Sequence, residues 1–201
     1  MDEEKTEETP KAPPAKKTLG QPSASEESAA KYPVMDLCQK MHRLTTHVAE
    51  PGLQEEVFEQ IATELENPAL YKHLQKTLNV YDGLPLTEKG LVDMEAKHTK
   101  HMEELNAKVE EAKESAGDME VLDARMEIAR FAAQSLSEEQ ALEAYKGVLD
   151  LPKISSGKKI DCLMESSRVA SFYGDTSKSD EFIESVSAMP HFLLIMTCFC
   201  K

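Results

Sequence analysis

The chain has 201 residues, and its 37 acidic side chains outnumber its 23 basic ones to give a formal net charge of −14. This charge argues against proteins that bind nucleic acid, because basic side chains that neutralise phosphates supply most of their affinity, and against binding to an anionic membrane surface. The length suits one domain, or one domain with a tail.

The chain carries no sign of membrane insertion or secretion. No apolar stretch approaches the ~18–20 residues of a membrane-spanning helix, and the acidic N-terminus MDEEKTEETP lacks the apolar segment of a signal peptide. The cysteines lack the dense spacing of a disulfide framework. We therefore expect a protein of the cytoplasm and nucleus.

Residues 1–31 differ in composition from the rest of the chain. They are rich in proline, glutamate and lysine, and Leu19 is their only large aliphatic side chain after Met1. Such a segment buries too little apolar surface to offset the entropy of ordering, so it is predicted to be a disordered acidic, proline-rich tail. A solvated extension without a role is favoured over a phosphorylated arm, for which the candidate residues are Ser23, Ser25 and Ser28.

Residues 32–117 are predicted to form the N-terminal helices. Apolar side chains recur at helical spacing over residues 35–44 and 53–65, which predicts two helices. Asn67 followed by proline predicts the N-cap of a third helix, which the turn at residues 82–85 closes.

A long charged helix is predicted over about residues 88–115. Thr87 serves as its N-cap, and Gly117 is expected just beyond its end, where glycine is common. One apolar stripe runs along it, formed by Leu91, Met94, His98, His101, Met102, Leu105, Val109 and Ala112.

Residues 118–186 are predicted to form TPR-like helical repeats. Asp118 is expected to cap one helix, and Ser137 with Gln140 has the form of a capping box for the next. Two more helices follow a loop at residues 152–157. Because no segment shows the period of two that strands require, the predicted fold class is all-α.

These helices contain an internal repeat. Residues 129–131 recur about 41 positions later at residues 170–172, and each half has the pattern helix, polar turn, helix. Small side chains mark where two helices of a hairpin cross closely: Ala132, Ala133, Ala141 and Ala144. The pattern is typical of an α-solenoid, although two repeats are fewer than the ~3 that such arrays usually need.

No group of residues predicts a catalytic, cofactor-binding or metal site. His98 and His101 share a helix face beside Glu104, but no further ligand at suitable spacing completes a metal site, so packing histidines are favoured. His42 and His47 are five residues apart and do not share a face.

Neither the cysteines nor the glycines predict catalysis. Cys198 and Cys200 form a lone CxC pair, whereas Cys38 and Cys162 fall within apolar stripes and are interpreted as buried thiols. Residues 157–159, Gly-Lys-Lys, lack the upstream glycine and the hydroxyl of a phosphate-binding loop. The acidic helix faces are interpreted as solvated surface, with contact to a basic partner as the alternative.

The order of these segments resembles a known family. The run from HMEELNAKVEEAKES through DARMEIARFAAQS and ALEAYKGVLD to KKIDCLMESSRVASFYGD, preceded by ENPALYKHLQKTLNVYD, is similar to the helical-repeat half of the 26S proteasome non-ATPase regulatory subunit 6 family, a component of the 19S lid. The resemblance covers about residues 32–186 and rests on serial order rather than on one motif. Subunit 1 of the COP9 signalosome shares this repeat domain and is the nearest alternative.

The resemblance implies a non-catalytic scaffold that supports ubiquitin-dependent protein degradation. Its partners would be other lid subunits, with no nucleic acid, membrane, small-molecule substrate or cofactor. In the family, further helical pairs and a PCI domain follow the repeats. Here residues 187–201 form an atypical apolar tail instead, which suggests a truncated form or an ending from another reading frame or an intron.

Two other classes compete with the scaffold interpretation. One is a metal or thiol enzyme that uses His98, His101 or the C-terminal cysteines. The other is a self-associating coiled coil over residues 88–115, which is disfavoured because its seam would span barely ~4 heptads and carry two histidines.

Overall fold

The computed structural model describes residues 35–46, 52–115 and 117–189. In these ranges every regular element is a helix and no strand occurs, so the predicted all-α class is confirmed. In chain order the elements are α2 (Met35–Thr45), α3 (Leu53–Gln60), the π-helical turn η1 (Ile61–Leu65), α4 (Pro68–Leu78), α5 (Glu88–Ser115), α6 (Asp118–Ser135), α7 (Glu138–Leu149), α8 (Ser156–Phe172) and α9 (Thr176–Ser187). The predicted tail at residues 1–31 and most of the apolar segment at 187–201 lie outside the described ranges.

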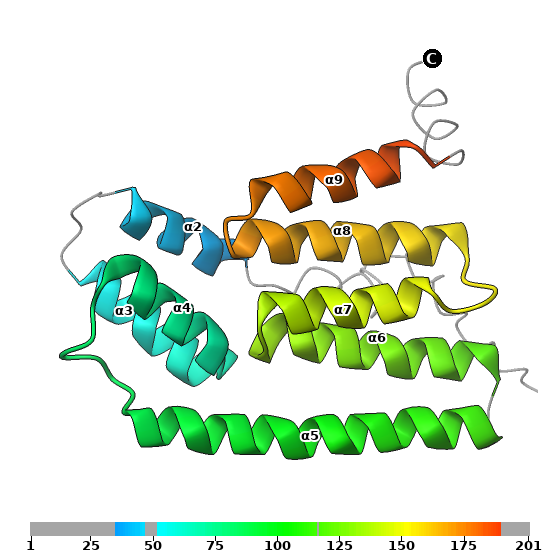
Figure 1. The fold of residues 1–201 in the computed structure, drawn as a ribbon, viewed down its shortest axis with the longest axis horizontal. Coiled ribbons are helices and arrows are strands. Elements are labelled where there is room, and N and C mark those ends of the chain that lie inside the picture. The colour runs from blue at the N-terminus through cyan, green and yellow to red at the C-terminus, as the bar shows by residue number, and fades with distance from the viewer. Residues whose placement is uncertain (1–34, 47–51, 116, 190–201) are drawn as a thin grey trace, which may run out of the picture.

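Helices α2, α3 and α4 form a cluster at one end of the molecule (Figure 1). Val57, Phe58 and Tyr71 are fully buried in its core, and the rings of Phe58 and Tyr71 meet edge-on with centroids 4.9 Å apart. Phe172, from the end of α8, is part of the same core. The N-terminal cluster is therefore packed against the second half of the chain.

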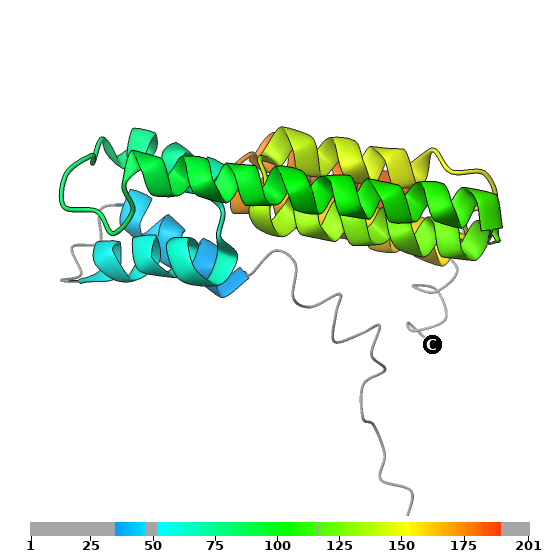
Figure 2. The ribbon, with the colours of Figure 1, turned by 90° about the horizontal axis from the view of Figure 1, so that it is seen from below.

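Helix α5 runs along the full length of the molecule, beneath both the N-terminal cluster and the later helices (Figures 1 and 2). It buries Leu91, His98, Leu105 and Val109, a spacing of seven, seven and four residues that keeps one side of the helix inward. Leu105 and Val109 pack with Ile128 of α6. The remaining faces of α5 are lined mainly with charged, exposed side chains.

Helices α6 to α9 are two antiparallel hairpins that stack in register (Figure 1). The first helix of each hairpin begins at Asp118 and Ser156, and the second at Glu138 and Thr176, so equivalent helices start 38 residues apart. The structural repeat is therefore 38 residues long, three residues shorter than the 41 expected from the sequence. Residues three apart share a helix face, so the shift preserves the apolar pattern that suggested it.

The 38-residue register is visible where the helices of each hairpin cross. Ala129, Ala133 and Ala141 are buried in the first hairpin, and their equivalents in the second are serines. These serines bond to one another, with 2.9 Å from Ser179 Oγ to Ser167 Oγ and 2.9 Å to Ser171 Oγ. Small side chains at these positions allow the close crossing that the sequence predicts.

Several predicted helix ends are confirmed. The Asn67 side chain accepts a hydrogen bond from Leu70 N at 2.8 Å, and the Ser137–Gln140 capping box forms. Thr87 Oγ1 accepts one from Gly90 N at 3.4 Å.

Other helix ends differ from the prediction. Gly117 is not a left-handed residue that closes α5 but the extended N-cap of α6, which puts Asp118 in the first turn rather than at the cap. Helix α4 ends earlier than expected, at the left-handed Asn79, and the sequence did not indicate the π-helical turn η1. Residues 156 and 157 lie in the first turn of α8, so the loop predicted at residues 152–157 is shorter than expected.

Candidate functional site: a buried polar network and an interhelical joint

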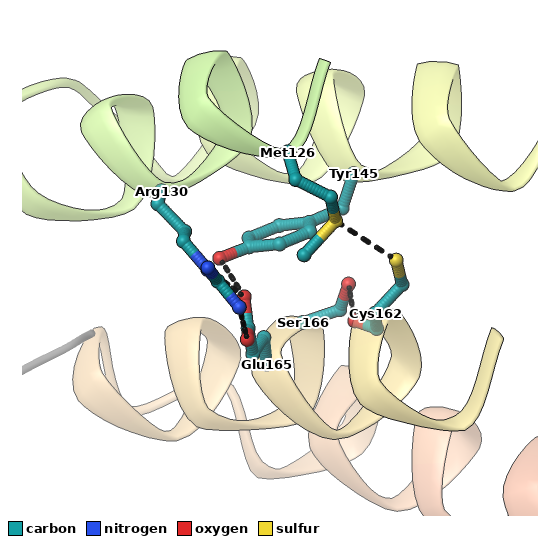
Figure 3. A network of polar contacts seen from close by, with 6 residues as sticks. All are labelled: Met126, Arg130, Tyr145, Cys162, Glu165 and Ser166. Atoms are coloured by element: carbon teal, nitrogen blue, oxygen red, sulfur yellow. Dashed lines mark hydrogen bonds and ion pairs between the residues drawn. The ribbon is translucent and has the colours of Figure 1, made fainter. Parts of the chain in front are cut away.

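A buried carboxylate joins three helices of the repeat region (Figure 3). Glu165 of α8 is only 2% exposed. Its Oε1 accepts a hydrogen bond from Arg130 Nη2 of α6 at 3.0 Å, and its Oε2 accepts one from the Tyr145 hydroxyl of α7 at 2.8 Å. Arg130 Nε lies 3.4 Å from the same Oε2. This Glu165 network therefore ties the second hairpin to both helices of the first.

The protonation states of the network follow from its burial and pairing. Burial, followed by the charge of Glu165, raises the pKa of the Tyr145 hydroxyl well above its usual range, so the phenol stays a donor. Burial alone would lower the pKa of Arg130, but the hydrogen bond and charge of Glu165 raise it overall. A buried carboxylate is tolerated when it is paired and hydrogen-bonded in this way.

The sulfur atoms beside the network favour packing over chemistry. Cys162 Sγ lies 3.4 Å from Met126 Sδ, and the hydroxyl of Ser166 donates to the carbonyl of Cys162 at 2.8 Å (Figure 3). Burial, reinforced by the charges of Glu165 and Asp161, raises the pKa of Cys162 to about 12. Because the thiolate is the reactive form, this thiol is held unreactive at neutral pH.

The sequence analysis did not identify Arg130, Tyr145 or Glu165 as partners. A signal was present, because Cys162, Glu165 and Val169 share the inward face of α8 at helical spacing. A carboxylate on such a face indicates a buried partner. The sequence does not indicate which cation that partner is.

A second polar group joins the N-terminal cluster to the hairpins. The Asn67 side chain, 1% exposed, caps α4 and donates through Nδ2 to the carbonyl oxygens of Gln134 at 2.9 Å and Leu136 at 3.0 Å. The Tyr173 hydroxyl also donates to the Leu136 carbonyl, at 2.9 Å, and Ser135 Oγ donates to the Leu65 carbonyl at 3.2 Å. This Asn67 joint fixes the end of α6 against the start of α4.

The two histidines of α5, His98 and His101, both pack against an aromatic ring of α6. His98 is buried and His101 exposed, and both rings meet Phe131 edge-on, at centroid distances of 5.6 and 4.6 Å. Burial lowers the pKa of His98, and its Nδ1 has no hydrogen-bond partner. Glu104 approaches only His101, at 3.5 Å.

The structure does not bring the other candidate residues together. Cys38 is half-buried, with its Sγ 3.6 Å from the Ser171 carbonyl, and burial raises its pKa. His42 is exposed on α2. The described ranges contain no group of three histidine, cysteine, aspartate or glutamate residues placed to hold a metal. The remaining candidates lie outside those ranges: Ser23, Ser25, Ser28, His47, Cys198 and Cys200.

Among the helices that the structure describes, none has both the length and the apolar character needed to cross a membrane. A groove of about 730 Å³ lies between α2, α4 and the α8–α9 turn, where Met41, Leu74 and Phe172 contribute apolar walls. This end of the molecule offers a contact surface rather than a converging set of reactive groups.

Comparison with known proteins agrees with this arrangement. The sequence profile of the family described as 26S proteasome subunit RPN7 matches residues 87–193, just over half of the chain. The matched region begins at the cap of α5 and covers both hairpins, including the Glu165 network. A search of curated proteins found no match. The chain belongs to the 26S proteasome subunit RPN7 family.

Proposed function

We propose that the chain is a non-catalytic scaffold subunit of the 26S proteasome regulatory lid and supports ubiquitin-dependent protein degradation through protein–protein contacts. The observation that carries the proposal is the family match over residues 87–193, which coincides with α5 and the two stacked hairpins. Within the family we assign it to the non-ATPase regulatory subunit 6 type. Its proposed location is the cytoplasm and nucleus.

The physical character of the described helices supports a scaffold. Stacked hairpins build an extended surface from a continuous core, a form suited to docking other proteins. The buried polar side chains of Glu165 and Asn67 are hydrogen-bonded within the chain. They stabilise the stack and are not available to a substrate.

The open side of α5 is the surface that we propose for lid partners. Its exposed residues include Glu103 and Glu111. In a chain with a net charge of −14, such a face favours a basic partner. Other lid subunits are the proposed partners, and no nucleic acid, membrane or small-molecule substrate is proposed.

The experiment is affinity purification of the tagged 201-residue chain from cells, followed by gradient sedimentation and mass spectrometry. We expect lid subunits to be recovered in fractions of proteasome size. Recovery of signalosome subunits alone would favour the alternative, a scaffold of the COP9 signalosome subunit 1 type. Recovery of neither complex would contradict the proposal.

Two pairs of charge-reversal variants test whether the exposed side of α5 contacts the lid subunits. Glu103→Lys with Glu111→Lys reverses two charges on α5, and Glu181→Lys with Glu184→Lys makes the same change on exposed positions of α9. We expect the α5 pair to reduce recovery of lid subunits at least fivefold and the α9 pair to leave it within twofold. Equal recovery from both pairs would place the contact elsewhere.

A further inference from the structure

In the 38-residue register, one face of the second hairpin is equivalent to the face of the first hairpin on which α8 packs. Helix α8 sits on the first hairpin through Met126, Arg130 and Tyr145. Because equivalent helices start 38 residues apart, the counterparts of Met126 and Tyr145 in the second hairpin are Met164 and Ile183.

The exposure of these pairs differs sharply. Met126 and Tyr145 are 3% and 0% exposed beneath α8, whereas Met164 and Ile183 are 38% and 45% exposed. They are large apolar side chains at positions equivalent to the two that α8 covers in the first hairpin. Within the described ranges, nothing covers them as α8 covers their counterparts.

The sequence that follows α9 can be aligned with α8 by the same 38-residue offset. Helix α7 ends at Leu149 and α8 begins at Ser156, while α9 ends at Ser187. The counterpart of Ser156 is therefore Leu194, after a connection of the same length, and the counterpart of Cys162 is Cys200. The sequence from residue 194, LIMTCFCK, is mostly apolar and contains no acidic side chain.

We propose that residues 194–201 dock on the α8–α9 face, covering Met164 and Ile183, with Cys200 placed against Met164 as Cys162 is placed against Met126. Burial of apolar surface on both sides supplies the driving force. The other possible occupant, a second copy of the chain, is an outcome of the test. The proposal does not depend on incorporation into the lid.

The experiment is intramolecular cross-linking in the 201-residue chain. Cys38→Ser and Cys198→Ser leave Cys200 as the reactive thiol, because Cys162 is fully buried. Met164→Cys then adds a thiol on the proposed face. The matched control is Glu184→Cys, which neighbours Ile183 but is the counterpart of Lys146, a residue that stays exposed beside α8. A short thiol-to-thiol cross-linker and peptide mapping give the rate for each chain.

We expect the Met164→Cys chain to cross-link to Cys200 within one molecule at least tenfold faster than the Glu184→Cys chain. Equal rates would overturn the proposal, and so would cross-links found only between two molecules, because they identify a second copy as the occupant. A second measurement avoids introduced thiols. Ile183→Asp, at an exposed position compatible with folding, should increase alkylation of Cys200 at least fivefold, and an unchanged rate would also overturn the proposal.

Discussion

The side-chain amide of Asn67 lies 3.0 Å from the backbone oxygen of Leu136, so the residue that caps α4 also holds the residue that follows α6. One side chain thereby links two segments 69 residues apart in the sequence. The orientation of the N-terminal cluster on the hairpins depends on this link.

Replacing Asn67 should separate its two roles. Asn67→Ala removes the cap and both amide donors and should lower the free energy of unfolding by about 2–4 kcal/mol. Asn67→Asp keeps the oxygen that caps α4, but it places a buried carboxylate against two carbonyl oxygens, so at pH 7 we expect a loss at least as large. Urea unfolding measures both variants. An aspartate variant as stable as the wild type would contradict the role of the amide donors.

The Glu165 network should respond unequally to loss of its two charges. Arg130→Met leaves a fully buried carboxylate without its cation and should destabilise the fold by about 3–5 kcal/mol. Glu165→Gln keeps an acceptor for Tyr145 and removes the buried charge, so a smaller loss of about 1–3 kcal/mol is expected.

A double variant provides the control for the network. Arg130→Met with Glu165→Leu removes both charges and should be more stable than Arg130→Met alone, because no buried charge remains unpaired. Urea unfolding at pH 7 of the wild type, Arg130→Met, Glu165→Leu and the double variant completes the cycle. Strictly additive losses would show that the two side chains do not interact.

Features set by residues close together in the sequence could be predicted, whereas contacts between distant residues could not. Asn67 and Ser137 cap helices through bonds to residues three positions away, so both were predictable. Gly117 was misassigned because glycine suits both the end of one helix and the start of the next. The partners Arg130 and Glu165 are 35 residues apart and meet only when the hairpins stack, so helical periodicity could not pair them.

The buried thiol of Cys162 should make the protein sensitive to alkali. Its pKa is raised from 9.0 to about 12 in the native state, so between these values the unfolded chain loses a proton that the native chain keeps. Stability is therefore unaffected below pH 9 and falls as pH rises toward 12. Urea unfolding at pH 8 and pH 10 should show a smaller fall for Cys162→Ala than for the wild type. Equal falls would contradict the raised pKa.

The buried His98 should lower the stability of the protein as the pH falls below 6.5. Burial lowers its pKa below the usual 6.5, so the unfolded chain binds a proton before the native chain does. Its contribution is present above pH 6.5 and is lost as pH falls through the lowered value. His98→Leu should flatten the loss of stability between pH 7 and pH 5, while His42→Leu at an exposed site should not. A proton titration by NMR that placed His98 above 6.5 would contradict this assignment.

The central claim is that the helical stack is a lid scaffold, and reconstitution tests it most directly. The purified chain, of 22.4 kDa, would be mixed with the remaining recombinant lid subunits and the products weighed by native mass spectrometry. A lid assembly heavier by one copy of the chain is predicted. A lid whose mass is unchanged, with the chain remaining free at its own mass, would contradict the claim.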